Sequence, residues 1–178
     1  MRDADPVTSP AEPRPFIRTR DADGTVTDRT ADSTGPAAGT DPRLGEQLSA
    51  LSGQRLSQYS IAINGVRLSF WGQDIATPSR EIFIEQDNIQ ITRPGQQPRL
   101  VPSHSELIAT ALLSTLNHQL TQAHINDGHL QLTFDNDLGL EVAPHPQWEA
   151  WQISSADHLL IVCTPGGQLT IWYPDPDS

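Results

Sequence analysis

Cys163 is the only thiol of the chain and therefore the first candidate nucleophile. A catalytic cysteine needs a histidine beside it and access to solvent. His145 and His158 are the candidates for that histidine. Cys163, however, ends the longest apolar run of the sequence, residues 159–163, where a free cysteine usually acts as a small hydrophobe. We expect no catalytic residues, and an enzyme that uses Cys163 remains the lesser alternative.

The histidines could also ligate a metal ion. His118, His124 and His129 are separated by six and five residues and stand near Asp127. No two of them have the i, i+4 spacing of a helical site, and no HExxH motif is present. The run Asp135-Asn136-Asp137 begins like a calcium loop but lacks its glycine and its twelfth-position glutamate. We expect turn and edge histidines, an ordinary hairpin loop, and neither metal nor cofactor.

Acidic and aromatic residues of the second half could instead bind a protein. If residues 148–153 form a strand, Trp148 and Ala150 share one face, and Glu149 and Trp151 share the other. One tryptophan would then lie in the core and the other half exposed beside acids, although both could be buried. Exposed tryptophan is a frequent interface hot spot. The predicted partner-binding residues are Asp135, Asp137, Glu141, Glu149 and Trp151.

The composition narrows the function. The chain of 178 residues has 22 acidic and 11 basic residues, all of the latter arginine, and a net charge of −11. Nucleic-acid binding needs clustered cations, and without lysine there is no Schiff-base or P-loop lysine. No run approaches the ~20 apolar residues of a membrane span, and no signal peptide is recognisable. We expect a cytoplasmic protein whose charge favours a basic protein partner.

Residues 1–42 differ in composition from the rest. Proline, aspartate, threonine, alanine and glycine dominate them, with few apolar side chains to offset the entropy of ordering. We expect a disordered acidic tail over 1–42 and a single domain over 43–178. An alternative for Phe16 and Ile17, which are flanked by Pro15 and Arg18, is a docking motif that adds to a partner's sheet edge.

Two helices are predicted in the domain. Leu44, Leu48 and Leu51 have helical spacing, which predicts a short helix over 43–52. The main helix is predicted over 103–116, where Ser103 and Glu106 would form a capping box ahead of an apolar face.

Alternating apolar residues predict strands around these helices. Residues 56–63 and 66–70 flank Asn64-Gly65, a strong type I′ hairpin signal. Residues 81–85 and 89–91 are predicted to pair, with a polar connector over 94–102. Further strands are expected near 130–134, 138–142, 148–153, 159–164 and 169–173, with 159–163 buried on both faces.

The second half repeats the first. A shift of 64 residues without gaps superposes Leu56 on Leu120, Leu68 on Leu132 and Phe70 on Phe134, and it also superposes the preceding helices. Chance similarity between two hairpins is the alternative. The predicted fold class is α+β: antiparallel twisted sheets from a duplicated helix–hairpin unit, with halves near 43–93 and 103–173 and the helix over 103–116 packed on the sheet.

The C-terminal half carries a resemblance to a known family. An acidic turn between two strands leads to Trp148-Glu149-Ala150-Trp151, and then to the turn Val162-Cys163-Thr164-Pro165-Gly166-Gly167. This pattern resembles a family of small domains of unknown function common in high-GC bacteria, over about residues 50–172 and most strongly from 130 onward. Some such domains are similar to immunity proteins of bacterial toxin systems. The resemblance implies the domain boundaries and no established activity.

These observations favour a non-enzymatic protein-binding module of the cytoplasm. Its most concrete form is an immunity-type inhibitor that binds and occludes a basic toxin or effector domain. The alternative is a small-ligand or regulatory domain with a pocket between the duplicated halves.

Overall fold

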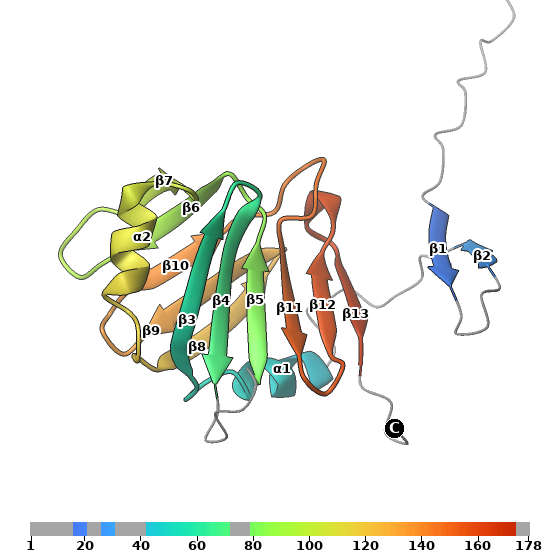
Figure 1. Cartoon of the computed structure of the whole chain (residues 1–178), viewed down its shortest axis with the longest axis horizontal. Helices are drawn as coiled ribbons and strands as arrows, with labels where there is room; N and C mark the ends of the chain where they lie inside the picture. The colour runs from blue at the N-terminus through green and yellow to red at the C-terminus, as the bar shows by residue number, and fades with distance from the viewer. Residues whose placement is uncertain (1–15, 21–25, 31–41, 72–78, 174–178) are drawn as a thin grey trace, which may run out of the picture. The chain divides into compact units, whose positions relative to one another are not determined.

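The computed structural model describes residues 16–20, 26–30, 42–71 and 79–173, in two units that divide after Pro36. In the first unit, β1 (Phe16–Arg20) pairs antiparallel with β2 (Val26–Thr30), shown in blue in Figure 1. The sequence did not predict this hairpin, because its few apolar residues cannot build a core. The remainder of the expected tail up to residue 41 lies outside the described residues.

The described residues of the second unit include two α-helices, α1 (Pro42–Ser49) and α2 (Glu106–Leu113), both shorter than predicted. Ser105 caps α2, since its hydroxyl oxygen accepts a hydrogen bond from the Ile108 amide nitrogen at 3.4 Å. The capping box predicted at Ser103 is wrong: Ser103 is buried, and its amide nitrogen donates to the Asp87 carbonyl oxygen at 2.8 Å. No described helix is long and apolar enough to cross a membrane.

Antiparallel sheets dominate this unit, as predicted, so it is mainly β with two helices. One sheet has six strands in the order β13-β12-β11-β5-β4-β3, and the other has five in the order β7-β6-β10-β9-β8 (Figure 1). The strands are β3 (Arg55–Ala62), β4 (Gly65–Trp71), β5 (Arg80–Ile84), β6 (Asn88–Thr92), β7 (Arg99–Pro102), β8 (Leu120–Asn126), β9 (His129–Phe134), β10 (Gly139–Val142), β11 (Trp151–Ser155), β12 (Leu160–Cys163) and β13 (Leu169–Trp172).

One predicted pairing and one predicted connector are corrected. Strands β5 and β6 do not pair, because the residues between them carry the chain from the six-stranded to the five-stranded sheet. β5 lies between β4 and β11, and β6 lies between β10 and β7. The expected polar connector over 94–102 contains β7, whose Val101 is buried in the core.

The first hairpin forms with its turn one residue earlier than predicted. Ala62 pairs with Gly65, so the turn residues are Ile63 and Asn64. Glycine at position 65 is required by a close approach, since a Cβ there would lie 2.2 Å from the Ile84 carbonyl oxygen. The type I′ geometry, with positive φ at both central residues, occurs instead at Asp127 and Gly128 in the turn between β8 and β9.

The two sheets enclose one hydrophobic core. Phe70 of β4 and Phe134 of β9 are buried and stack across it, with ring centroids 6.3 Å apart. Ile161, Val162 and Cys163 of β12 are all buried, as expected for a central strand. The two sheets are also linked where β3 and β8 begin, since Arg55 of β3 and Gln119, the residue before β8, form an isolated antiparallel bridge.

The elements of the two halves correspond closely. Positions 42–49 of α1 shifted by 64 are those of α2, and β3 and β8 both have a bulge, between Leu56 and Gln58 and between Leu120 and Gln122. Two hydrogen bonds between the halves are equivalent under the same shift of 64 residues, which relates Gly53 to Asn117 and Leu56 to Leu120. They run from Gly53 N to Leu120 O at 2.7 Å and from Asn117 N to Leu56 O at 2.8 Å.

Each half also lends strands to the sheet of the other. The β6–β7 pair of the first half completes the sheet of β8–β10, and the β11–β12 pair of the second half completes the sheet of β3–β5. The halves differ at two places that matter below. The connection from Val142 to Trp151 is four residues longer than the equivalent one from Ile84 to Ile89. In the described part of the chain, β13 has no counterpart beside β7.

Candidate functional site

The longer connection, residues 143–150, is held in place from several elements. The Nδ1 atom of His145 accepts hydrogen bonds from the amide nitrogens of Gln147 and Trp148, both at 3.1 Å. The Gly166 amide nitrogen donates to the His145 carbonyl oxygen at 2.9 Å, and the Gln86 side chain donates to the Ala143 carbonyl oxygen at 2.9 Å. The loop therefore has a defined conformation before any partner binds.

Trp148 is the side chain that this loop presents to solvent. It is 66% exposed, and its ring stacks on His145 with centroids 6.1 Å apart. A rigid, exposed indole offers a large contact area at little entropic cost on binding. Among the described residues, Trp148 is thus the best-formed candidate for an anchor that could bind a protein partner.

The prediction that Trp151 is a partner contact is wrong on accessibility. Trp151 is only 1% exposed, and its indole nitrogen donates a hydrogen bond to the Gly128 carbonyl oxygen at 2.8 Å. The face argument failed because β11 begins at Trp151, so Trp148 precedes the strand and does not follow its alternation. The simpler expectation, that both tryptophans are mostly buried, is also wrong, because Trp148 is exposed.

Two carboxylates stand at the same end of the domain as Trp148. Glu149 follows it and is exposed, as is Glu85, whose amide nitrogen bonds to the Ala150 carbonyl oxygen at 2.9 Å. Partial desolvation of its carboxyl group by the surrounding protein, and to a smaller extent the negative charge of Glu149, raise the pKa of Glu85 above its usual value. Glu85 escaped the sequence analysis because only the crossing between sheets brings it to this loop.

The other predicted acidic residues lie elsewhere. Asp135 and Asp137 are exposed in the turn before β10, whereas the 143–150 loop follows β10. The Asp135 carboxylate contacts the Nδ1 atom of His118 at 2.6 Å. Glu141, in the middle of β10, is half-buried. Its carboxylate contacts the His129 Nδ1 atom at 3.0 Å and accepts a hydrogen bond from the Gln90 side-chain Nε2 atom at 3.2 Å. The five predicted residues therefore do not form one surface.

The described residues give no support to the candidates for chemistry. Burial raises the pKa of the Cys163 thiol to about 11, so the thiolate is scarce at neutral pH. Its sulfur lies 3.5 Å from the Gly128 carbonyl oxygen. His124 is exposed on β8. Nowhere in the described ranges do three or more His, Cys, Asp or Glu side chains gather into a metal-binding group.

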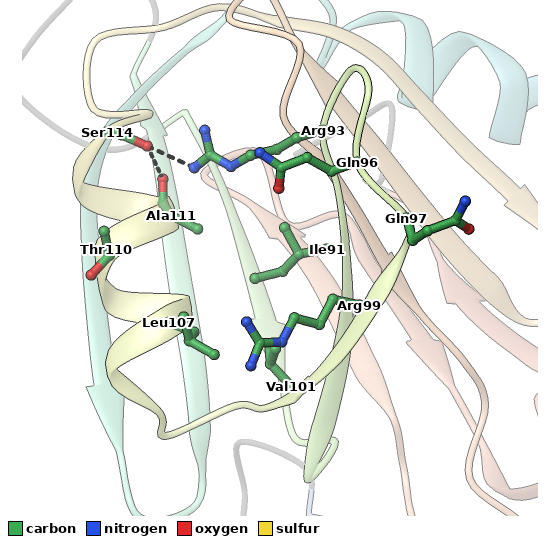
Figure 2. Close-up of a pocket in the computed structure, with 10 residues that line it drawn as sticks. All are labelled: Ile91, Arg93, Gln96, Gln97, Arg99, Val101, Leu107, Thr110, Ala111 and Ser114. Carbon is green, nitrogen blue, oxygen red and sulfur yellow. Dashed lines mark hydrogen bonds between the residues drawn. The ribbon is translucent and has the colours of Figure 1, made fainter.

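A pocket of about 460 Å³ lies between α2 and the β6–β7 hairpin (Figure 2). Ile91, Val101 and Ala111 contribute apolar surface, and Figure 2 shows the side chains of Arg93 and Arg99 extending across the pocket toward α2. The Arg93 guanidinium donates to the Ser114 hydroxyl oxygen at 3.1 Å. Sequence reasoning missed both arginines because it assigned them to, or beside, a connector.

Comparison with known proteins identifies a family for this chain but no individual relative. No curated protein matches the chain. No solved structure matches it either. The model of a family of unknown function, DUF6188, matches residues 47–173, which include both halves of the β structure, the 143–150 loop and the pocket under α2. The chain therefore belongs to this family of unknown function, DUF6188.

Proposed function

We propose that this protein is a non-enzymatic module that binds another protein through the 143–150 loop, with Trp148 as the central anchor. The observation that carries the proposal is an exposed tryptophan, held by a hydrogen-bonded loop, beside the carboxylates of Glu85 and Glu149. Aromatic anchors supply binding energy at interface centres, and charges around them set orientation and association rate.

The charge of the chain favours a basic partner. A net charge of −11 accelerates encounter with a cationic surface, and this effect weakens with added salt. The most concrete form of the proposal is an immunity-type inhibitor in the cytoplasm that covers the site of a basic toxin or effector domain. In that role Trp148 inserts into the partner and the acidic residues neutralise cations around it.

The test uses matched tryptophan variants. The full-length chain, Trp148→Ala and Trp172→Ala are each used to capture proteins from a lysate of the source cells, and captured proteins are identified by mass spectrometry. Trp172 is also exposed, at 48%, but lies at the end of β13. We expect one stoichiometric basic partner that Trp148→Ala loses and Trp172→Ala retains.

The purified partner then gives the quantitative result. Removing a hot-spot tryptophan weakens binding by roughly 30-fold or more, equivalent to about 2 kcal/mol. Neutralising Glu149 with Glu149→Gln slows association at low salt and has little effect at high salt. Retention of the same partner at unchanged affinity by Trp148→Ala would reject the proposed site.

The pocket under α2 supports a second candidate function, the binding of a small ligand. It lies between β6–β7 of the first half and α2 of the second. A ligand that binds only the folded protein raises its Tm. A metabolite whose Tm shift is lost in Arg93→Gln would establish this function, and a screen without such a compound would leave the protein-binding proposal ahead.

A further inference from the structure

The six-stranded sheet contains one strand more than the five-stranded sheet, and the pairing registers locate it. Ile153 pairs with Ile82 and Ile161, just as Ile91 pairs with Leu140 and Arg99. The hairpin β11–β12 is therefore equivalent to β6–β7. β12 has a further partner, β13, on its outer side, whereas β7 ends its sheet in the described part of the chain.

The pocket occupies the position that β13 fills in the other half. In β13, Leu169 pairs with Cys163 and Ile171 with Ile161, and both β13 side chains pack against the core. The equivalents of Cys163 and Ile161 are Val101 and Arg99, which line the pocket.

The helices show the same relationship. Leu107 on α2 is equivalent to Arg43 on α1, and Arg43 lies over the ring of Tyr173, the residue after β13, at 4.0 Å from its centroid. β13 and Tyr173 of the second half thus fill the space under α1, a helix of the first half. The equivalent space, between α2 of the second half and the β6–β7 hairpin of the first, is the open pocket of about 460 Å³ that Leu107 lines.

The vacant position differs from its equivalent in charge. Arg99 stands where the second half has Ile161, and Arg93 stands where it has Ser155. Within the described residues, neither guanidinium forms an ion pair with a carboxylate, in contrast to Arg67, which contacts Glu81 at 2.9 Å. The groove beside β7 is therefore a cationic spot on an acidic protein, and an acidic occupant complements it.

We propose that the outer edge of β7 and the groove under α2 receive an extended acidic segment of a partner protein, which adds to the five-stranded sheet as β13 does to the other. Unpaired backbone groups of an edge strand bind such a segment, and alternate side chains enter the groove. The side chain opposite Val101 is apolar, and the side chain opposite Arg99 is aspartate or glutamate. A second copy of this chain pairing through β7 is disfavoured, because β7 itself (Arg99–Pro102) has no carboxylate to complement Arg99.

The probe is a peptide that copies residues 167–173 and carries Ile171→Glu, which places a carboxylate opposite Arg99. The control peptide carries Ile171→Lys. Binding of each fluorescein-labelled peptide to the full-length protein is followed by fluorescence anisotropy. Because one peptide gains an attraction where the other meets repulsion, we expect the glutamate peptide to bind about tenfold more tightly.

Two protein variants of equal charge locate the binding. Arg99→Gln removes one positive charge at β7, and Gln122→Glu adds one negative charge on β8, the opposite edge of the same sheet. We expect Arg99→Gln to abolish the preference for the glutamate peptide and Gln122→Glu to retain it. Trp148→Ala should leave peptide binding unchanged, which separates this proposal from the protein-binding loop.

Several outcomes would overturn the proposal. Equal binding of the two peptides, or a preference that survives Arg99→Gln, would show that the β7 groove is not the site. Acetate is also tested as a competitor of the glutamate peptide. If acetate displaces this peptide from the protein with Arg99 intact but not, at the same concentration, from Arg99→Gln, the groove is a site for small carboxylates. Concentration-dependent dimerisation that Arg99→Gln abolishes would assign the edge to a second copy.

Discussion

Gly128, in the β8–β9 turn, lies against Gly167, and Gly167 in turn lies close to Pro144 of the 143–150 loop. The variant Gly128→Ala tests this contact. A Cβ at Gly128 would lie 2.5 Å from the Cα atom and 2.7 Å from the carbonyl oxygen of Gly167. Both are backbone atoms and cannot move aside as a flexible side chain can. The φ angle of Gly128 is also positive, at 77°, so the substitution meets two separate penalties.

The magnitude follows from adding these penalties. Left-handed backbone costs an alanine about 1–2 kcal/mol, and forcing a methyl group into a packed site adds about 1–3 kcal/mol. We expect Gly128→Ala to lower the free energy of unfolding by about 2–5 kcal/mol. For a domain of this size, each kcal/mol lowers Tm by about 2–4 °C.

Gly166→Ala is the matched control. Gly166 also has a positive φ, at 81°, but a Cβ there has nothing within 4 Å. Its cost should therefore be the backbone strain alone, about 1–2 kcal/mol. Both variants are unfolded in urea and compared at a common m value. Equal losses of stability in the two variants would refute the close contact between the β8–β9 turn and Gly167.

Other predictions concern burial and charge. Trp151→Ala should cost about 3–5 kcal/mol in urea unfolding, whereas Trp148→Ala should cost under about 1 kcal/mol, since only Trp151 is buried. Because the folded pKa of Cys163 is raised from 9.0 to about 11, the folded state holds the thiol proton more tightly; stability should fall as pH rises from 9.0 to about 11, and Cys163→Ala should remove that part of the slope. Glu149→Gln should lower the pKa of Glu85 in an NMR titration, because it removes a neighbouring negative charge.

Local patterns in the sequence predicted the elements that depend on near neighbours. The alternation on both sides of Asn64-Gly65 identified β3 and β4, and the leucine spacing from Leu44 identified α1. The match of Leu56 and Phe70 to Leu120 and Phe134 predicted the correspondence between the hairpins, because both members of each pair face the same core.

Pairings between distant segments were beyond the sequence. Nothing local distinguishes β5 paired with β6 from β5 paired with β11, since the choice depends on the crossing between the sheets. The same crossing brings Glu85 to Glu149 and turns Arg99 toward α2, so neither candidate surface could be assembled from spacing alone. The sequence predicted Trp151, and not Trp148, as the exposed partner contact, because the strand begins three residues later than the alternation suggested.

The exchange of strands between the halves has a consequence for folding during synthesis. β5 is complete at Ile84, but its neighbour β11 begins only at Trp151, 67 residues later. At roughly 5–20 residues per second, the edge of β5 waits several seconds for its partner. Neither half can close its own sheet alone, so we expect the ribosome-bound first half to remain open to aggregation and to chaperones until nearly the whole domain has emerged.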